Sequence, residues 1–136
     1  MKNLTKQELD LIFNKASKID GCDPNVWRMD ASGAIIKRSS YGRDDEWYGW
    51  EVDHIVPRSL LERNGVPEDL INDDRNLRPL NWNNNNSKDD DYPDYWIVVE
   101  ADEFQERNVS VNKEKTISEK KRKELKELYK DYVQLD

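Results

Sequence analysis

A single cysteine in a chain of 136 residues limits the ways in which this protein can be held together. Cys22 has no second thiol for a disulfide bond within the chain, and the sequence has no CxxC motif of the kind that binds structural zinc. The fold must therefore depend on apolar packing. The length suits one domain with one modest core, which we predict to span residues 1–136.

The sequence shows neither an apolar run long enough to span a membrane nor the features of a signal peptide at its start. We therefore expect a cytoplasmic protein that has no membrane partner.

Helical patterns occur towards both ends of the chain. A threonine followed three residues later by glutamate, the form of a capping box, occurs at Thr5 and again at Thr116. Apolar residues at helical spacing follow each of them. These patterns predict accessory helices over 5–19 and 117–135.

Strand patterns occupy the middle of the chain, and together with the helices they predict an α+β protein. Two runs that flank a turn sequence predict a hairpin over 26–37. An aromatic-rich run predicts a strand over 47–52, and a second short strand is expected at 76–80. A helix is expected at 81–88, where an asparagine can cap its start, and a further strand at 95–100.

The net charge of −7 disfavours binding to nucleic acid, because phosphate contacts normally come from a basic surface. The charge is unevenly distributed, however. Residues 44–106 carry a balance of −13, whereas 1–43 and 107–136 each carry +3. Acidic side chains in the middle could serve a metal and the two ends could contact phosphates. We expect weak nonspecific DNA binding, or dependence on a protein partner.

His54 is the only histidine, and its neutral imidazole can accept a proton near pH 7, as a general base must. A lone histidine is more often structural, so its neighbours decide the interpretation. Asp53 precedes it, and Pro57 indicates that the strand stops nearby. Adjacent side chains of an extended strand point to opposite faces, so both residues can serve one site only if the chain turns here.

Asn76 and Asn85 are the other informative positions. Carboxylate and amide oxygens are hard ligands that suit Mg²⁺ or Mn²⁺ better than zinc, which seeks nitrogen or sulfur. An asparagine-rich stretch can also be no more than the polar start of a helix. For any one asparagine taken alone, that is the more frequent explanation.

Three blocks, taken in order, carry a family resemblance. They are Glu51-Val52-Asp53-His54-Ile55-Val56-Pro57, Asn76-Leu77-Arg78-Pro79-Leu80 and Asn85-Asn86-Ser87-Lys88. Together they resemble the motif of the HNH endonuclease family, in its small bacterial and phage form without zinc CxxC motifs. The resemblance covers residues 47–91 and implies a ββα-metal core, a hairpin followed by a helix that clasp one metal ion. The outer helices and the extra hairpin would surround this core.

The resemblance implies a role for each matching residue. His54 corresponds to the general base, Asp53 to the first metal ligand and Asn85 to a ligand from the helix. Asn76 corresponds to the middle residue of the motif, which belongs to the catalytic set and braces the loop that bears the histidine. Glu51 is a secondary candidate for a supporting acid, and Asp89 is a weak candidate for a further metal ligand. Arg58 and Lys88 are candidates for phosphate contacts.

The metal ligand on the helix is uncertain by one register step. Asn85 lies three residues before Lys88, as the motif requires, but Asn84 and Asn86 stay open. Because zinc motifs are missing, the hairpin needs apolar support, expected from Trp47, Trp50, Leu80 and Trp82. We likewise expect four of the five tryptophans in the core rather than stacked on bases, namely Trp27, Trp47, Trp50 and Trp96.

The predicted activity is hydrolysis of phosphodiester bonds in DNA, with one Mg²⁺ or Mn²⁺ stabilising the leaving oxygen. RNA as substrate is not distinguished by the sequence. The main alternative is a noncatalytic protein that keeps the HNH scaffold and binds a basic partner through its acidic surface. Net charge favours this alternative, and the intact set of motif residues disfavours it.

Overall fold

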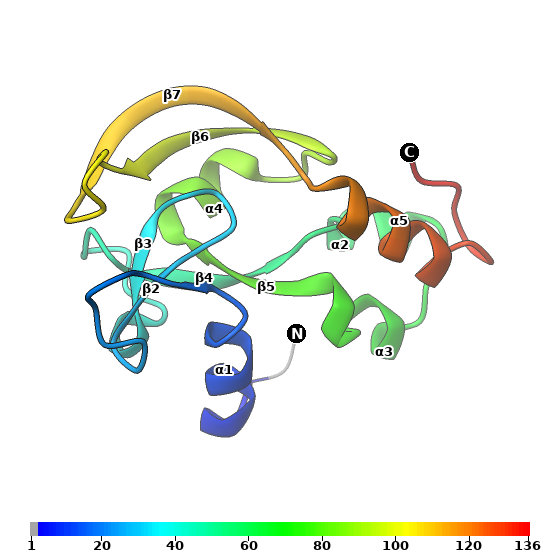
Figure 1. Cartoon of the computed structure of the whole chain (residues 1–136). Helices are drawn as coiled ribbons and strands as arrows, with labels where there is room; N and C mark the ends of the chain where they lie inside the picture. The colour runs from blue at the N-terminus through cyan, green and yellow to red at the C-terminus, as the bar shows by residue number, and fades with distance from the viewer. Residues whose placement is uncertain (1–2) are drawn as a thin grey trace.

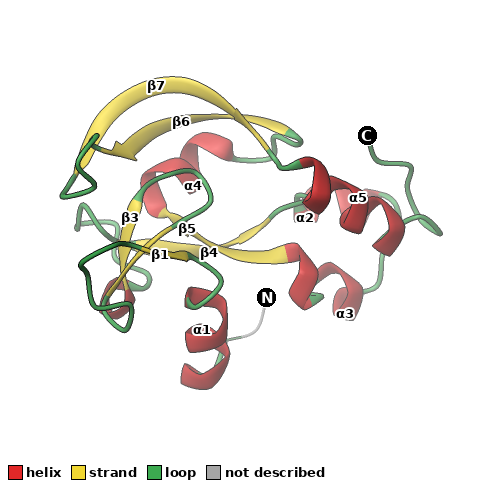
Figure 2. Cartoon of the chain, in the orientation of Figure 1, coloured by secondary structure: helices red, strands yellow, loops and turns green. Residues whose placement is uncertain are grey.

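The computed structural model describes residues 3–136, so the first two residues of the predicted domain lie outside it. The described chain combines helices with three small antiparallel sheets, which makes it an α+β protein, as predicted (Figure 1, Figure 2). None of the helices in the described part has the length and apolar character needed to cross a membrane. The helices are α1 (Lys6–Phe13), α2 (Arg58–Arg63), α3 (Glu68–Ile71), α4 (Trp82–Lys88) and α5 (Glu119–Leu128), with 3₁₀ turns at Arg38–Ser40 and Asp74–Asn76. The strands are β1 (Ser17–Lys18), β2 (Trp27–Met29), β3 (Ile35–Lys37), β4 (Trp50–His54), β5 (Leu77–Asn81), β6 (Asp94–Ala101) and β7 (Asn108–Thr116).

The centre of the molecule is a strand–strand–helix unit. β4 pairs antiparallel with β5, which places Asp53 opposite Arg78 and His54 opposite Leu77. α4 follows β5 directly, and Asn81 caps it by accepting hydrogen bonds from two backbone N–H groups of its first turn, as the sequence predicted. The long β6–β7 hairpin arches over α4 on the side away from β4 and β5 (Figure 1).

Asn84 fastens α4 to β6. Its Nδ2 donates to the carbonyl of Val99 at 2.8 Å, and its Oδ1 accepts from the N–H groups of Val98 and Val99 at 2.9 and 3.0 Å. The side chain is fully buried, so these bonds replace the strand partner that this edge of β6 lacks. α4 is therefore held from both sides, by β4 and β5 below and by β6 above.

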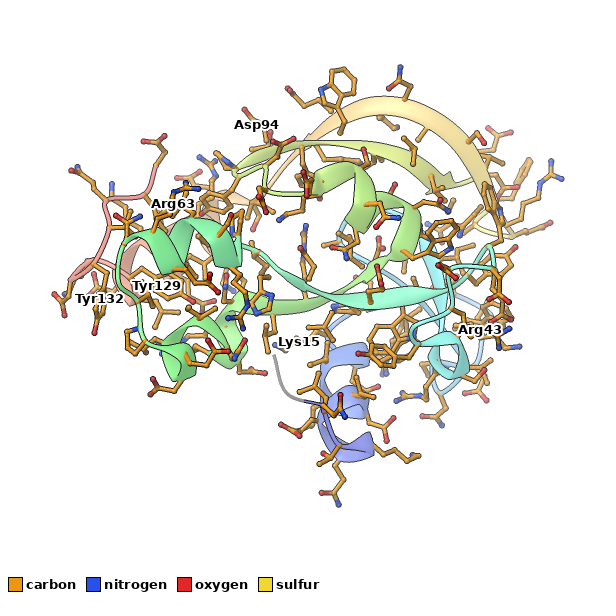
Figure 3. The ribbon with its side chains drawn as sticks, turned by 180° about the vertical axis from the view of Figure 1, so that it is seen from behind. Lys15, Arg43, Arg63, Asp94, Tyr129 and Tyr132 are labelled. Carbon is orange, nitrogen blue, oxygen red and sulfur yellow. The ribbon has the colours of Figure 1, made fainter. Side chains whose placement is uncertain are left out.

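Apolar packing holds the outer elements, as expected for a chain without disulfides. One cluster joins α2, α3, α5 and β6, with Tyr129 at its centre; this side chain is fully buried and its hydroxyl donates to the carbonyl of Leu70 at 2.7 Å (Figure 3). A second cluster packs α1 under the β4–β5 hairpin, where Phe13 contacts Trp50 at a ring distance of 5.4 Å.

The N-terminal helix and the first hairpin are confirmed, with a shorter helix than predicted. The Thr5 capping box forms in both directions. α1 ends at Phe13 rather than at residue 19, because the following residues turn and add β1 to the edge of β2. The predicted hairpin over 26–37 forms as β2 and β3.

The C-terminal helix is shorter than the predicted 117–135 at both ends, because it begins at Glu119 and ends at Leu128. Thr116 belongs to the end of β7, where its hydroxyl donates to Asp94 Oδ1 at 2.7 Å. Ser118 caps the helix instead. Of the four tryptophans expected in the core, Trp50 is buried, as predicted, and Trp27 is half-buried. Trp47 and Trp96 are 41% and 49% exposed, so the expectation was wrong for these two.

Gly49, immediately before β4, is required by a close approach of the backbone. A Cβ atom at this position would lie 1.8 Å from the carbonyl oxygen of Arg43. The polar loop over residues 39–48 can therefore fold tightly against the start of β4 only with glycine here.

Candidate functional site

His54 lies at the end of β4, and its Nε2 is 2.8 Å from Oδ1 of Asn72, the residue that follows α3. The same oxygen accepts from Arg58 Nη2 at 3.2 Å, while Asn72 Nδ2 donates to Glu68 Oε1 at 3.1 Å. These two contacts orient the amide so that its oxygen faces the imidazole. Nε2 of neutral His54 must then carry the hydrogen, which leaves the lone pair on Nδ1.

The protonation state suits a base. Burial lowers the pKa of His54 below its usual value of 6.5, although the bond to Asn72 opposes the shift. The ring is therefore neutral at pH 7. Within residues 3–136, Nδ1 has no hydrogen-bond partner.

Arg58 supports Asn72 and is not a free cation. Its guanidinium makes two 2.8 Å bonds to the carboxylate of Glu68 and a 3.0 Å bond to Glu62. The guanidinium lowers the pKa of Glu68 to about 2. The structure therefore places Arg58, a predicted phosphate contact, in a network whose geometry holds Asn72 against His54.

Asn76 braces the chain after His54, as the resemblance implied. It is fully buried, its Oδ1 accepts from the N–H of Val56 at 2.8 Å, and its Nδ2 donates to the carbonyls of Val56 and Ile71 at 3.1 and 3.3 Å. All of these partners are backbone groups. Asn76 thus fixes the turn that carries the imidazole and takes no part at the surface of the site.

Asp53 faces the interior, and cations hold both of its oxygens. Arg78 Nε lies 2.8 Å from Oδ2, and Lys88 Nζ lies 3.3 Å from Oδ1. The carboxylate is 4% exposed. A third cation beside two positive charges is electrostatically unfavourable, so Asp53 is a poor metal ligand in this arrangement.

Lys88 is likewise placed in the interior, where no phosphate can reach it. It is 1% exposed, and its ammonium group also donates to the carbonyl of His54 at 3.1 Å. Burial lowers its pKa, and the charge of Asp53 opposes that shift. The structure thus replaces the predicted phosphate contact with a buried ion pair between α4 and β4.

A cavity of about 170 Å³ nevertheless brings most of the predicted residues together. It opens beside the end of β4 and the C-terminal end of α4. Its walls come from Val52, Asp53, His54, Pro57, Arg58, Asn85, Asp89 and Asp90. The sequence placed a shared site here, and the structure gives Asp53, His54 and Asn85 a common cavity.

Asn85 is the asparagine of α4 that reaches this cavity. Its Nδ2 donates to Glu51 Oε1 at 3.0 Å, and its Oδ1 has no hydrogen-bond partner in the described part of the chain. Asn84 is used to fasten β6, and Asn86 is exposed and does not line the cavity. Glu51 therefore orients the amide, the supporting role that the resemblance implied.

Asp89 has an unusual backbone conformation for a residue with a side chain. Its φ of 47° and ψ of −121° lie in a region that favours glycine, and Asp91 N–H bonds to Lys88 O at 2.9 Å to close a tight turn. Such strain costs about 1–3 kcal/mol and is concentrated at functional sites. Here it holds a carboxylate at the wall of the cavity.

The donor set at the cavity fits a hard divalent cation only in part. Asn85 Oδ1 and the carboxylates of Asp89 and Asp90 are oxygen donors of the kind that Mg²⁺ takes, one or two at a time with retained water. Within residues 3–136, no three His, Cys, Asp or Glu side chains are grouped so that they could hold a metal. The cavity therefore offers oxygen donors but no complete set of protein ligands for a metal ion.

Two residues of this region were not found from the sequence. Asn72 lies in the long connection between the motif blocks, and Arg78 lies inside a block but has no assigned role in the motif. Neither position is marked by its spacing in the sequence, because both residues act through partners that are distant in the sequence.

Comparisons with family models, with curated proteins and with solved structures found no match for this chain.

Proposed function

We propose that this protein is an HNH-type, metal-dependent endonuclease that hydrolyses phosphodiester bonds in DNA. The observation that carries the proposal is the state of His54. An imidazole fixed through Nε2 by Asn72 presents an Nδ1 that has no partner among residues 3–136, beside a cavity with hard oxygen donors. The order of β4, β5 and α4 supports a ββα-metal core, as does Asn76 bracing the histidine turn.

In the proposed reaction, Nδ1 of His54 removes the proton from the water molecule that attacks phosphorus. The positive charge that forms on the ring is stabilised through Nε2–H by the Asn72 oxygen. General-base assistance of this kind is typically worth about 10²–10⁴-fold in rate. A Mg²⁺ or Mn²⁺ ion, when bound, supplies Lewis-acid stabilisation of the leaving oxygen.

Asn85 and Asp89 are the residues that would hold the ion. This differs from the assignment by resemblance, in which Asp53 is the first ligand, because the two oxygens of Asp53 already contact Arg78 and Lys88. In the proposal, Asp53 stabilises the positions of α4 and β5 around the cavity.

Incubation of purified protein with supercoiled plasmid and Mg²⁺ or Mn²⁺ tests the proposal. We expect nicking that EDTA abolishes and that His54→Ala reduces by at least about 100-fold while the circular dichroism spectrum is unchanged. Asn85→Ala and Asn86→Ala form a matched pair on one helix. Only Asn85→Ala is expected to raise the metal concentration needed for half-maximal cleavage.

A negative result on DNA has two interpretable forms. Cleavage of single-stranded or structured RNA by the same residues would change the substrate and keep the mechanism. No cleavage of any nucleic acid, together with saturable binding of a basic protein, would favour the noncatalytic alternative, which the balance of −13 over residues 44–106 supports. A cytoplasmic location is part of the proposal, on the basis of the single cysteine and the polar composition.

A further inference from the structure

A second cavity, separate from the proposed nuclease site, has an incompletely satisfied arginine in its wall. Arg78 uses Nε to bond Asp53 Oδ2 at 2.8 Å. Its Nη2 is buried and has no hydrogen-bond partner among residues 3–136, and the side chain is 10% exposed. Lys88 occupies the other oxygen of Asp53, which prevents the usual two-bond contact between guanidinium and carboxylate.

The surroundings of Arg78 are those of an anion site. The cavity has a volume of about 550 Å³, which is within the range of small-molecule sites, and it shares no wall residue with the cavity at His54. Tyr95 forms part of the wall, with its ring centroid 5.2 Å from Cζ of Arg78. Ser118, the N-cap of the ten-residue helix α5, stands at the same cavity and directs that helix start towards it.

Cations outnumber anions around this cavity. Its walls include Lys15, labelled in Figure 3, and three further basic residues, against two acidic ones, Asp74 and Glu124. Both acidic side chains are already paired, Asp74 with Lys15 at 2.9 Å and Glu124 with Lys121. The other two wall cations pair with acids outside the wall, Arg75 with Asp73 and Arg78 with Asp53. Arg78 differs from the other three in keeping a buried nitrogen that has no partner among residues 3–136.

We propose that this cavity binds a phosphate group, either free or carried by a nucleotide. A phosphate oxygen in the cavity can accept a hydrogen bond from a guanidinium nitrogen that Asp53 does not use, and hydrogen bonds between charged groups are the strong ones. The helix start at Ser118 adds favourable interaction with an anion. The volume accommodates a nucleoside monophosphate, with Tyr95 and Ile117 as apolar walls.

Calorimetric titration of the full chain tests this site, in EDTA and at fixed ionic strength. The probes are inorganic phosphate, AMP and adenosine. We expect saturable binding of phosphate or AMP and none of adenosine; tighter binding of AMP identifies a nucleotide as the carrier, and equal affinity identifies free phosphate. Arg78→Gln should weaken binding by about 10-fold or more, since a charged hydrogen bond is lost.

Two further variants control for misfolding and for a general effect of the protein's positive charge on anion binding. Lys121→Gln removes a charge at the cavity, and Lys123→Gln removes one from the same helix outside it. We expect a loss of about threefold or more for the first only. Amide shifts in wild-type protein should map to Tyr95 and Ser118. Equal losses in both lysine variants, shifts confined to the His54 cavity, or no saturable binding would overturn the proposal.

The nuclease proposal can fail without affecting this one. His54→Ala should leave phosphate binding unchanged, because His54 does not line this cavity. Loss of binding in His54→Ala would show that the phosphate occupies the other cavity, and would overturn the inference.

Discussion

Asp53 and His54 are neighbours on one strand, yet the structure gives them opposite surroundings. His54 is partly exposed and oriented by one amide oxygen, and its second nitrogen has no hydrogen-bond partner in the described part of the chain. Asp53 is buried between two cations. The strand stays extended through both residues, so their side chains diverge, and only the rim of one cavity brings them together.

The contrast distinguishes, within a single motif, residues that are placed for chemistry from residues that stabilise the fold. A residue that must exchange protons or bind substrate needs an unsatisfied atom at an accessible surface, and His54 Nδ1 and Asn85 Oδ1 meet that requirement. A residue with all of its atoms satisfied in the interior contributes to the fold. By this criterion Asp53, Asn76 and Lys88 contribute to the fold around the cavity and have no direct part in the proposed reaction.

Asp53→Ala should have the largest effect on stability. It leaves Arg78 and Lys88 buried without their shared counter-ion, and breaking buried ion pairs of this kind costs about 3–5 kcal/mol. The free energy of unfolding from urea titration measures the loss, with the exposed Asp90→Ala as control. A loss below about 1 kcal/mol would mean that the two cations are not held as described, and would return Asp53 to the candidate metal ligands.

Asn72→Ala should lower the rate of the proposed nicking by about 10- to 100-fold, the size of loss seen when the hydrogen-bond partner that orients a metal-bound histidine is removed. Asn64→Ala is a suitable control, because Asn64 lies in the same connection and its side chain donates to the carbonyl of Leu60, away from His54. Cleavage rates at fixed metal concentration provide the measurement. Equal rates in the two variants would remove Asn72 from the mechanism.

Asp89→Gly should stabilise the fold by about 1 kcal/mol, because glycine adopts a positive φ without strain. Asp90→Gly, at the next position, should instead destabilise it slightly, since glycine adds freedom to the unfolded chain. If Asp89 is a metal ligand, the stabilised Asp89→Gly variant will also need more Mg²⁺ for cleavage. Unfolding and cleavage titrations of the two variants would show whether this strain serves function.

The pH dependence of stability should show a small contribution from His54. Its pKa in the folded state lies below the usual 6.5, so the unfolded chain takes up the proton first as pH falls. The stability associated with the neutral ring is complete above about pH 6.5 and is lost as pH falls through the folded-state pKa. Unfolding free energies at several pH values should show a flatter profile for His54→Gln over that interval. An unchanged slope would indicate a ring that is not desolvated.

Local patterns predicted the elements where one segment determines them. Thr5 and Asn81 cap helices as expected, since a cap requires only neighbouring backbone groups. The ends of helices were less predictable: residues after Phe13 have apolar spacing that continues the helical pattern, but they are used by a turn and by β1. Thr116 has the spacing of a cap and is held instead in β7 by its cross-strand partner Asp94.

The candidate site was predictable in its membership and not in its connections. The spacing of the motif blocks indicated His54, Asn76 and Asn85 but left Asn84 and Asn86 open, and of these three asparagines of α4 only Asn85 lines the cavity in the structure. The partners of Asp53 and the orienting role of Asn72 depend on side chains that meet only in the folded molecule. No spacing rule describes such contacts.

The most direct test of the account is the ¹⁵N NMR spectrum of the His54 ring, which is free of overlap because the chain has no other histidine. We predict a neutral ring with hydrogen on Nε2 and a pKa below 6.5. In Asn72→Ala the preference for this tautomer should weaken. A ring protonated on Nδ1, or a pKa above 6.5, would contradict the proposal that His54 presents a free base to the cavity.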